Sequence, residues 1–326
     1  MRPDFSVLLL TTLIGVGQGL FLALFTVQLY ALADLVPAPD GQRFYALGSL
    51  AALVFLAGGL VASFFHLGRP ERAWRTAARW RTSWLSREVI VLPALMGIVF
   101  LFGVAHLAAW RPVLAVLPSG VAIDATVALG TAGTVLAFAL YLCTAMIYAC
   151  LPFLREWASW LTVANYTLLG GASGFTAAAA LAAWAAPDLV RFLAGWAAVI
   201  TALGAASRIA SLVRNARLKP RSTLQTAIGV KHPRIVQSAV GFLGGSYNTK
   251  EFFHGRSRAV LRSVKWGFLV AAFAIPLALL AAAWAGAPPA ALVAAFVIQY
   301  FGLLAERWFF FAQANHPQNL YYQAVA

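Results

Sequence analysis

Charged residues and cysteines are both scarce in this sequence. Only 10% of its 326 residues are charged and 62% are apolar, whereas a typical globular domain contains about 25% charged and about 45–50% apolar residues. This composition excludes an ordinary water-soluble protein. The two cysteines are too few for a disulfide framework, and they are too few for an iron–sulfur cluster, which normally takes four thiolates.

In place of charge, the sequence has long apolar runs. A helix needs about 20 such residues to cross a bilayer, and a membrane β-barrel would need alternating segments of roughly ten residues, which are absent. We therefore predict an all-α integral membrane protein with eight transmembrane helices, a single polytopic domain over residues 1–326 grouped as two four-helix bundles. The sixth and eighth runs are short and are expected to extend into their polar ends. The runs are Val7–Leu32, Phe44–Phe65, Val89–Trp110, Ala125–Phe153, Leu161–Ala186, Phe192–Ser207, Trp266–Ala285 and Ala290–Leu304.

The distribution of positive charge predicts the orientation. An even number of spans places both termini on one side of the membrane, and the segments on that side hold 21 of the 24 Lys and Arg residues. Acidic residues divide 6 to 4 between the sides, so the asymmetry belongs to the basic residues. Because basic residues accumulate in cytoplasmic loops, we predict cytoplasmic termini in a bacterial inner (cytoplasmic) membrane. Without the long Arg208–Lys265 segment the basic count is still 9 to 3.

Residues that could hold a metal or a nucleotide are missing. A transmembrane haem usually takes two facing histidines, and only His66 and His106 lie in or near a run. They fall at opposite ends of adjacent antiparallel helices, so no haem is expected. The sequence has no nucleotide-binding loop and no nucleophile motif, and no nucleic-acid partner is expected. The interiors of the runs carry almost no ionisable residues, which argues against a secondary transporter.

The segment between the second and third runs concentrates the polar residues that could carry chemistry. It opens with His66-Leu67-Gly68-Arg69-Pro70 and closes with Ser83-Trp84-Leu85-Ser86-Arg87-Glu88. One interpretation is a basic hairpin whose Trp and Arg residues anchor the helices at the lipid headgroups, and residue types alone favour it. In the other interpretation His66 carries a proton near neutral pH and Glu88, at the start of a helix, relays it.

A quinone is the ligand that this second interpretation fits. A membrane-dissolved molecule that gains or loses two protons needs an apolar approach, hydrogen-bond donors for its oxygens and an acid–base route to water. In this interpretation His66 and Glu88 would transfer the protons, and Arg69, Arg72 and Arg87 would be the donors to the quinol oxygens. Arg87 is alternatively an ion-pair partner of Glu88, and a lipid headgroup is an alternative ligand.

Two further segments carry unusual residues. In Gly15-Val16-Gly17-Gln18-Gly19 the glycines favour close helix packing, and Gln18 either makes an interhelical hydrogen bond, which is favoured, or lines a ligand cavity. The long segment Arg208–Lys265 includes the aromatic run from Gly241 to Gly255. Buried interfaces prefer aromatic residues and Arg, so we expect this segment to dock a soluble protein of the same complex, although lipid headgroups are an alternative partner.

These motifs resemble those of the membrane anchor subunits of dimethyl sulfoxide reductase and its relatives. The residues that carry the resemblance are His66–Pro70, Ser83–Glu88 and Asn248–Gly255, and the likeness covers essentially the whole chain. The resemblance implies a haem-free anchor that exchanges electrons between quinone (ubiquinone or menaquinone) and a four-cluster iron–sulfur subunit, which is wired to a molybdopterin catalytic subunit. It also implies a quinone site at His66, Gly68, Arg72 and Glu88.

The predicted orientation favours one branch of this family. Dimethyl sulfoxide reductase anchors of enteric type present the site and their partners on the periplasmic face, whereas the charge count here places the same motifs in the cytoplasm. This resembles the anchors of cytoplasm-facing sulfite-oxidising enzymes. We therefore expect quinone reduction during sulfite oxidation to sulfate, with residues 66–88 as the quinone-site loop and residues 208–265 as the docking loop. The alternatives are a dimethyl sulfoxide reductase anchor that oxidises quinol and a purely structural anchor.

Overall fold

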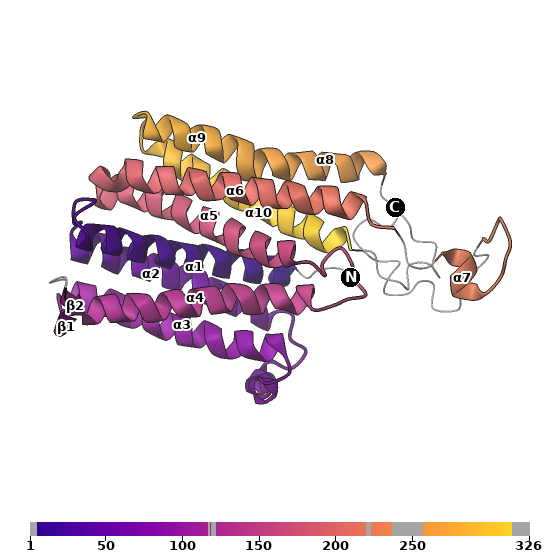
Figure 1. The fold of residues 1–326 in the computed structure, drawn as a ribbon, viewed down its shortest axis with the longest axis horizontal. Coiled ribbons are helices and arrows are strands. Elements are labelled where there is room, and N and C mark those ends of the chain that lie inside the picture. Colours follow the sequence, from indigo (N-terminus) through magenta and orange to yellow (C-terminus); the bar gives the residue numbers. More distant parts are fainter. Residues whose placement is uncertain (1–4, 117, 119–121, 220–222, 237–256, 315–326) are drawn as a thin grey trace.

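The computed structural model describes residues 5–116, 118, 122–219, 223–236 and 257–314, and within these the chain is a bundle of long helices (Figure 1). Eight of its helical segments are long and apolar enough to cross a membrane. The runs of the sequence predict all eight, so the prediction of an all-helical protein with eight spanning helices is confirmed.

The helices run back and forth along one axis. The spans are α1 (Phe5–Leu32), η1 (Gly41–Ala46) with α2 (Leu47–Phe64), α3 (Trp84–Leu107), α4 (Ala125–Ala149), α5 (Trp160–Ala185), η3 (Pro187–Leu189) with α6 (Val190–Ala216), α8 (Arg258–Leu269) with η5 (Val270–Ala274) and α9 (Ile275–Trp284), and α10 (Ala290–Ala312). The helix α1 begins and α10 ends at the same end of the bundle (Figure 1). We call this the His66 end, because α2 also ends there, at Phe64.

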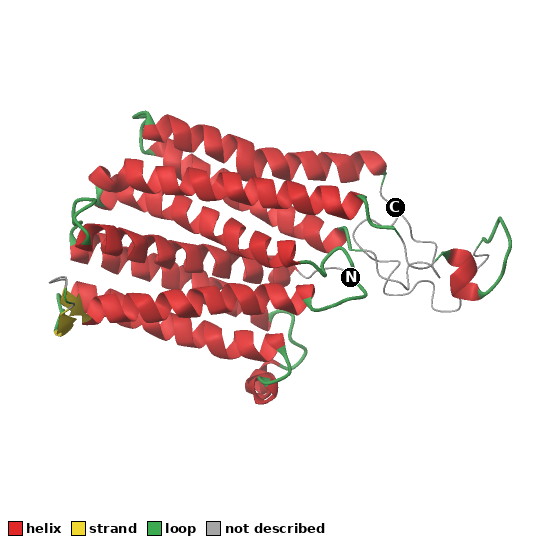
Figure 2. Ribbon diagram, viewed as in Figure 1, coloured by secondary structure: helices red, strands yellow, loops and turns green. Residues whose placement is uncertain are grey.

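Short elements lie at the two ends of the bundle. At the His66 end, the 3-10 helix η2 (Pro70–Arg79) joins α2 to α3, and α7 (Leu224–Ile228) follows α6. At the other end, β1 (Val113–Val116) and β2 (Ala122–Asp124) pair as an antiparallel hairpin (Figure 2). The sequence runs do not predict this hairpin.

The helices α1 and α5 approach each other closely through glycine. A Cβ on Gly19 would meet the backbone of Gly170, Gly171 and Gly174, and a Cβ on Gly174 would meet the backbone of Gly19 and Leu20. This confirms the packing role predicted for the glycines of the first run. The grouping into two four-helix bundles stays a prediction, because α1 packs against α5 as well as against α2.

The sixth and eighth helices extend into their polar ends as expected, and the extensions matter for the site. The helix α6 continues past Ser207 to Ala216, and α10 continues past Leu304 to Ala312. Arg208, Glu306 and Arg307 are consequently buried within spans instead of lying in loops. The expectation that the span interiors carry almost no ionisable residues is therefore wrong at the His66 end of α6 and α10, where charges of opposite sign lie together.

Many large apolar side chains point outward from the bundle. Leu50, Val54, Phe100, Leu101 and Phe301 are each at least half exposed. An apolar exterior of this extent belongs in lipid. The chain is a multi-pass membrane protein.

Candidate functional site

His66 lies just beyond the last turn of α2 and is half-buried. Its Nδ1 atom is 3.3 Å from Ser6 Oγ, in the first turn of α1. The Ser6 side chain is itself buried, with 9% of its surface exposed. A buried hydroxyl from a neighbouring helix restricts the rotation of the imidazole, so the ring has a defined orientation at the edge of the bundle.

The residues that follow His66 are open to their surroundings. Gly68 and Arg69 are not buried, and a Cβ on Gly68 would meet no atom within 4 Å. Arg72 is paired with Glu71 at 3.8 Å, but both side chains are more than half exposed. An exposed pair of this kind contributes little to stability, so Arg72 can rearrange toward a ligand.

Arg87 connects the η2 segment to α3. Its Nε and Nη2 atoms each donate a hydrogen bond of 2.9 Å, to the carbonyl oxygens of Trp80 and Arg81 respectively, and its guanidinium lies 4.1 Å from the centre of the Trp84 ring. Arg87 and Glu88 both lie in the described part of the chain, and no ion pair joins them there. Because its contacts hold the loop against α3, the geometry favours a structural role over donation to a quinone.

Glu88 is buried inside α3, with 5% of its surface exposed. The helix begins at Trp84, where the side chain of Ser83 caps it by accepting from the backbone N–H of Ser86. Glu88 is therefore beyond the first turn, so the expectation of a carboxylate at the helix N-terminus is wrong: the dipole effect decays within that turn. Its Oε1 atom instead accepts a hydrogen bond of 2.5 Å from Thr144 Oγ1 on α4.

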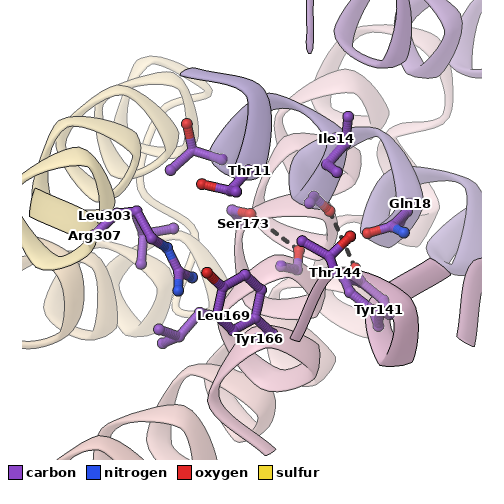
Figure 3. A pocket seen from close by; sticks show the side chains of 13 residues that line it. Thr11, Ile14, Gln18, Tyr141, Thr144, Tyr166, Leu169, Ser173, Leu303 and Arg307 are labelled. Atoms are coloured by element: carbon purple, nitrogen blue, oxygen red, sulfur yellow. Dashed lines mark hydrogen bonds between the residues drawn. The ribbon is translucent and has the colours of Figure 1, made fainter. Parts of the chain in front are cut away.

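Thr144 also faces a narrow polar cavity inside the bundle, between α1, α4, α5 and α10 (Figure 3). The free space suffices for about one or two water molecules, which is too little for a quinone ring. The cavity is lined by Thr11, Thr12, Ile14, Gly15, Gln18, Tyr141, Thr144, Tyr166, Leu169, Gly170, Ser173, Leu303 and Arg307.

Gln18 makes the interhelical contact that the sequence favours. Its Nε2 atom donates a long hydrogen bond of 3.5 Å to the carbonyl oxygen of Ala137 on α4, and its side chain also lines the cavity (Figure 3). The interhelical hydrogen bond is therefore confirmed, whereas the role of Gln18 in a ligand cavity stays a prediction, because the cavity that it lines has room only for water. His66 and Ser6 lie at the end of the bundle.

Sequence reasoning missed three buried ionisable residues: Arg307, which lines the cavity, and its neighbours Arg208 and Glu306. Arg208 Nε of α6 is 2.6 Å from Glu306 Oε1 of α10, and each side chain is 1% exposed. Arg307 Nη2 is 3.9 Å from Glu306 Oε2. A sequence signal for them exists: the apolar run resumes after the Glu306–Arg307 pair with Trp308-Phe309-Phe310-Phe311-Ala312, so the charges are flanked by membrane-spanning sequence on both sides.

Thr144 has no comparable signal. It is one of several threonines in an apolar run, and its partner Glu88 is 56 positions away in the sequence. Within the described residues, no group of three or more His, Cys, Asp or Glu side chains could hold a metal ion. The aromatic run at residues 241–255, which carries part of the docking prediction, lies outside the described residues.

The arrangement supports proton chemistry at the His66 end. It provides a half-buried histidine in a fixed orientation, a buried carboxylate one helical turn inside α3, and exposed arginines in the intervening loop. Carboxylates buried in a membrane bundle are costly and usually functional.

Comparisons with known proteins agree with one another. The family model described as DMSO reductase anchor subunit (DmsC) matches residues 1–310. Over its full 326 residues, the chain is 56% identical to a protein of Allochromatium vinosum that is named as a subunit of sulfite dehydrogenase, and the match covers 100% of both chains.

Proposed function

Because this chain belongs to the DMSO reductase anchor subunit (DmsC) family, we propose that it is the quinone-reactive membrane anchor of a three-subunit molybdopterin oxidoreductase. It passes electrons between a partner iron–sulfur subunit with four clusters and membrane quinone, either ubiquinone or menaquinone. The molybdopterin subunit performs the substrate chemistry, and the metal centres belong to the partner subunits. This chain itself binds no haem.

The observation that carries this proposal is the position of Glu88. It is a buried carboxylate with a hydrogen bond to Thr144, at the same end of the bundle as the half-buried His66. Quinone needs two protons for every two electrons, and each must come from a group that can both hold and release it. A purely structural anchor has no need of a buried carboxylate that lacks an ion-pair partner among the described residues.

The roles of the other residues follow from their exposure. His66 and Glu88 transfer protons to the quinone oxygens, Gly68 leaves space for the head group, and Arg69 and Arg72 donate hydrogen bonds. Arg87 holds the loop, since two of its donors bond backbone carbonyls. Gln18 contributes to the cavity behind the site rather than to the quinone itself.

Sulfite oxidation is the reaction that the relative favours. The Allochromatium vinosum protein is named for sulfite dehydrogenase. In that reaction, sulfite and water give sulfate, two protons and two electrons, and the two electrons with two protons convert quinone to quinol. The basic segments of the His66 end, between α2 and α3 and between α6 and α8, would dock the partners in the cytoplasm. A dimethyl sulfoxide reductase anchor that oxidises quinol is the second candidate, because the family is named for it.

Replacement of His66 in the assembled complex tests the proposal. We expect His66→Ala to lower sulfite:quinone activity about a hundredfold or more, the range expected for removing a general acid–base group. Sulfite oxidation with an artificial acceptor should be unchanged, because that activity needs only the partner subunits. His66→Gln, which can still bond Ser6 but cannot carry a proton at neutral pH, should behave like His66→Ala.

Full quinone activity in both histidine variants would refute the assigned role. Full quinone activity in His66→Ala and Glu88→Gln together would favour the purely structural anchor, which predicts that quinone binds elsewhere in the complex.

A further inference from the structure

Arg208, Glu306 and Arg307 leave one positive charge without a full compensating partner inside the membrane. The close pair is Arg208 with Glu306, at 2.6 Å. Arg307 approaches the same carboxylate only to 3.9 Å and is 5% exposed. Three ionised groups with one negative charge carry a net charge of about +1, and an unbalanced charge is costly in a low-dielectric interior.

The side chain of Arg307 lines the cavity (Figure 3). Its guanidinium lies 3.7 Å from the centre of the Tyr166 ring, a distance typical of cation–π stacking. Its Nε atom is buried without a hydrogen-bond partner among the described residues. A buried guanidinium with a spare donor at a polar cavity is a site for ordered water.

Glu88 is connected to the same cavity by its hydrogen bond with Thr144, which lines it. A threonine hydroxyl has one donor and two acceptor positions, and here the donor is directed to Glu88. Its acceptor positions are left for water in the cavity that Thr144 lines. Among the described residues, Glu88 and Glu306 are the buried carboxylates, and Glu306 is taken by Arg208. Glu88 is therefore the negative group available to balance Arg307.

We propose that Arg307 is a positioning residue for Glu88. The positive charge of its guanidinium stabilises the Glu88 carboxylate across the cavity, where Tyr166, Thr144 and water lie between the two groups. This inference rests on the proposed function in one respect, namely that Glu88 changes its protonation during turnover. When quinone has received two electrons from the partner, the Glu88 O–H bond breaks and its proton forms an O–H bond to quinone. The carboxylate that remains is then stabilised until it is reprotonated from the cytoplasmic side.

Other charged groups face Glu88, and Arg307 is distinguished from them by burial. Arg87 is adjacent in sequence, but it is half-buried and directed to backbone carbonyls. The η2 arginines are not buried, so solvent screens them. Arg307 acts through a low-dielectric interior, where the same charge has a larger effect. Cys143 and Tyr148 of α4 and Tyr166 of α5 are further titratable groups near Glu88, and His66 lies beyond α2 at the same end of the bundle.

Infrared difference spectroscopy of the detergent-solubilised complex without added quinone measures this coupling directly. The carbonyl band of protonated Glu88, assigned by its absence in Glu88→Gln, should persist to about one pH unit higher in Arg307→Gln. The pH profile of sulfite:quinone activity should move in the same direction. Arg307→Lys keeps the charge and should restore both.

Two threonine variants give a matched comparison on one helix. Thr144→Val removes the hydroxyl between Glu88 and the cavity, and should change the Glu88 band. Thr131→Val removes an exposed hydroxyl of α4 that bonds its own helix, and should leave the band unchanged. If Arg307→Gln does not assemble, Thr144→Val decides: an unchanged Glu88 band in that variant overturns the inference.

The possible outcomes separate this inference from the proposed function. An unchanged band and pH profile in a folded Arg307→Gln complex, with artificial-acceptor activity intact, would overturn the role of Arg307 and leave the quinone proposal standing. If the Glu88 band shifts in Arg307→Gln and the Glu88→Gln complex keeps full quinone activity, the coupling between Arg307 and Glu88 is supported and the proton-transfer role of Glu88 is refuted.

Discussion

At the residue scale, the orientation of His66 depends on a hydroxyl of the neighbouring helix. Ser6 Oγ lies 3.3 Å from His66 Nδ1, and a hydrogen bond of this kind is worth about 0.5–1.5 kcal/mol net. We expect Ser6→Ala to lower kcat/KM for quinone about two- to tenfold, because the imidazole samples more orientations. Steady-state kinetics with a water-soluble quinone measures the change.

Ser63→Ala is the matched control for this prediction. The Ser63 hydroxyl donates to the carbonyl oxygen of Leu60 in its own helix α2, close to His66 in sequence. Its removal should leave kcat/KM unchanged. Equal losses in the two variants would mean that the end of α2 is sensitive to any substitution and that Ser6 does not orient the imidazole.

The site residues that can be predicted from the sequence are those whose side-chain chemistry is unusual for the surrounding sequence. His66 and Glu88 stand out because each is ionisable beside an apolar run, and Gln18 stands out because it is polar inside one. Thr144 and Tyr166 do not stand out, since both are common in membrane helices. Their importance comes from three-dimensional contacts with Glu88 and Arg307, and no sequence spacing encodes such contacts.

At the element scale, apolar runs predict that a helix exists better than they predict where it ends. Charge ends a run in the sequence but does not end a helix, because a buried charge is tolerated when it is paired. For this reason α6 and α10 continue through Arg208 and Glu306. The β1–β2 hairpin escaped prediction for a different reason: its strands have only four and three residues.

The contact between α1 and α5 depends on glycine at position 174. A Cβ on Gly174 would overlap the backbone of Gly19 and Leu20, and backbone atoms cannot move aside without separating the helices. We expect Gly174→Ala to destabilise the protein by about 1–3 kcal/mol, as overpacking does. Thermal unfolding in detergent, followed by the fluorescence of the 11 tryptophans, measures the loss.

Gly97→Ala provides the comparison for Gly174→Ala. Gly97 lies in the middle of α3, is exposed, and a Cβ there would meet no atom within 4 Å. Alanine is a better helix former than glycine, so this variant should be as stable as the native protein or slightly more stable. A Gly174→Ala protein with native stability would show that α1 and α5 can separate without loss.

At the scale of the whole molecule, the distribution of basic residues predicts which end faces the cytoplasm. The family membership that the motifs predict is confirmed, but the orientation stays a prediction, because a helix bundle looks alike from either side of a membrane. The loops carry the information instead: the predicted topology places 21 of 24 Lys and Arg residues on the His66 side. That count includes Arg208 and Arg307, which are buried within spans in the structure and do not lie in loops.

Orientation can be measured with the cysteines that the chain already has. Cys150 follows α4 at the His66 end and is exposed, whereas Cys143 is buried. We expect a membrane-impermeant maleimide to label Cys150 in inverted membrane vesicles and not in intact spheroplasts. The reason is that a cytoplasmic His66 end places this thiol out of reach from outside.

A marker at the opposite end makes the labelling experiment decisive even if a partner protein covers Cys150. In a Cys150→Ser background, Ala115→Cys places a thiol on the exposed β1 strand, which should be labelled in spheroplasts. Labelling of Ala115→Cys only in inverted vesicles would reverse the orientation. The residues of the proposed quinone site would then face the periplasm, and the proposal of cytoplasmic sulfite oxidation would lose its support.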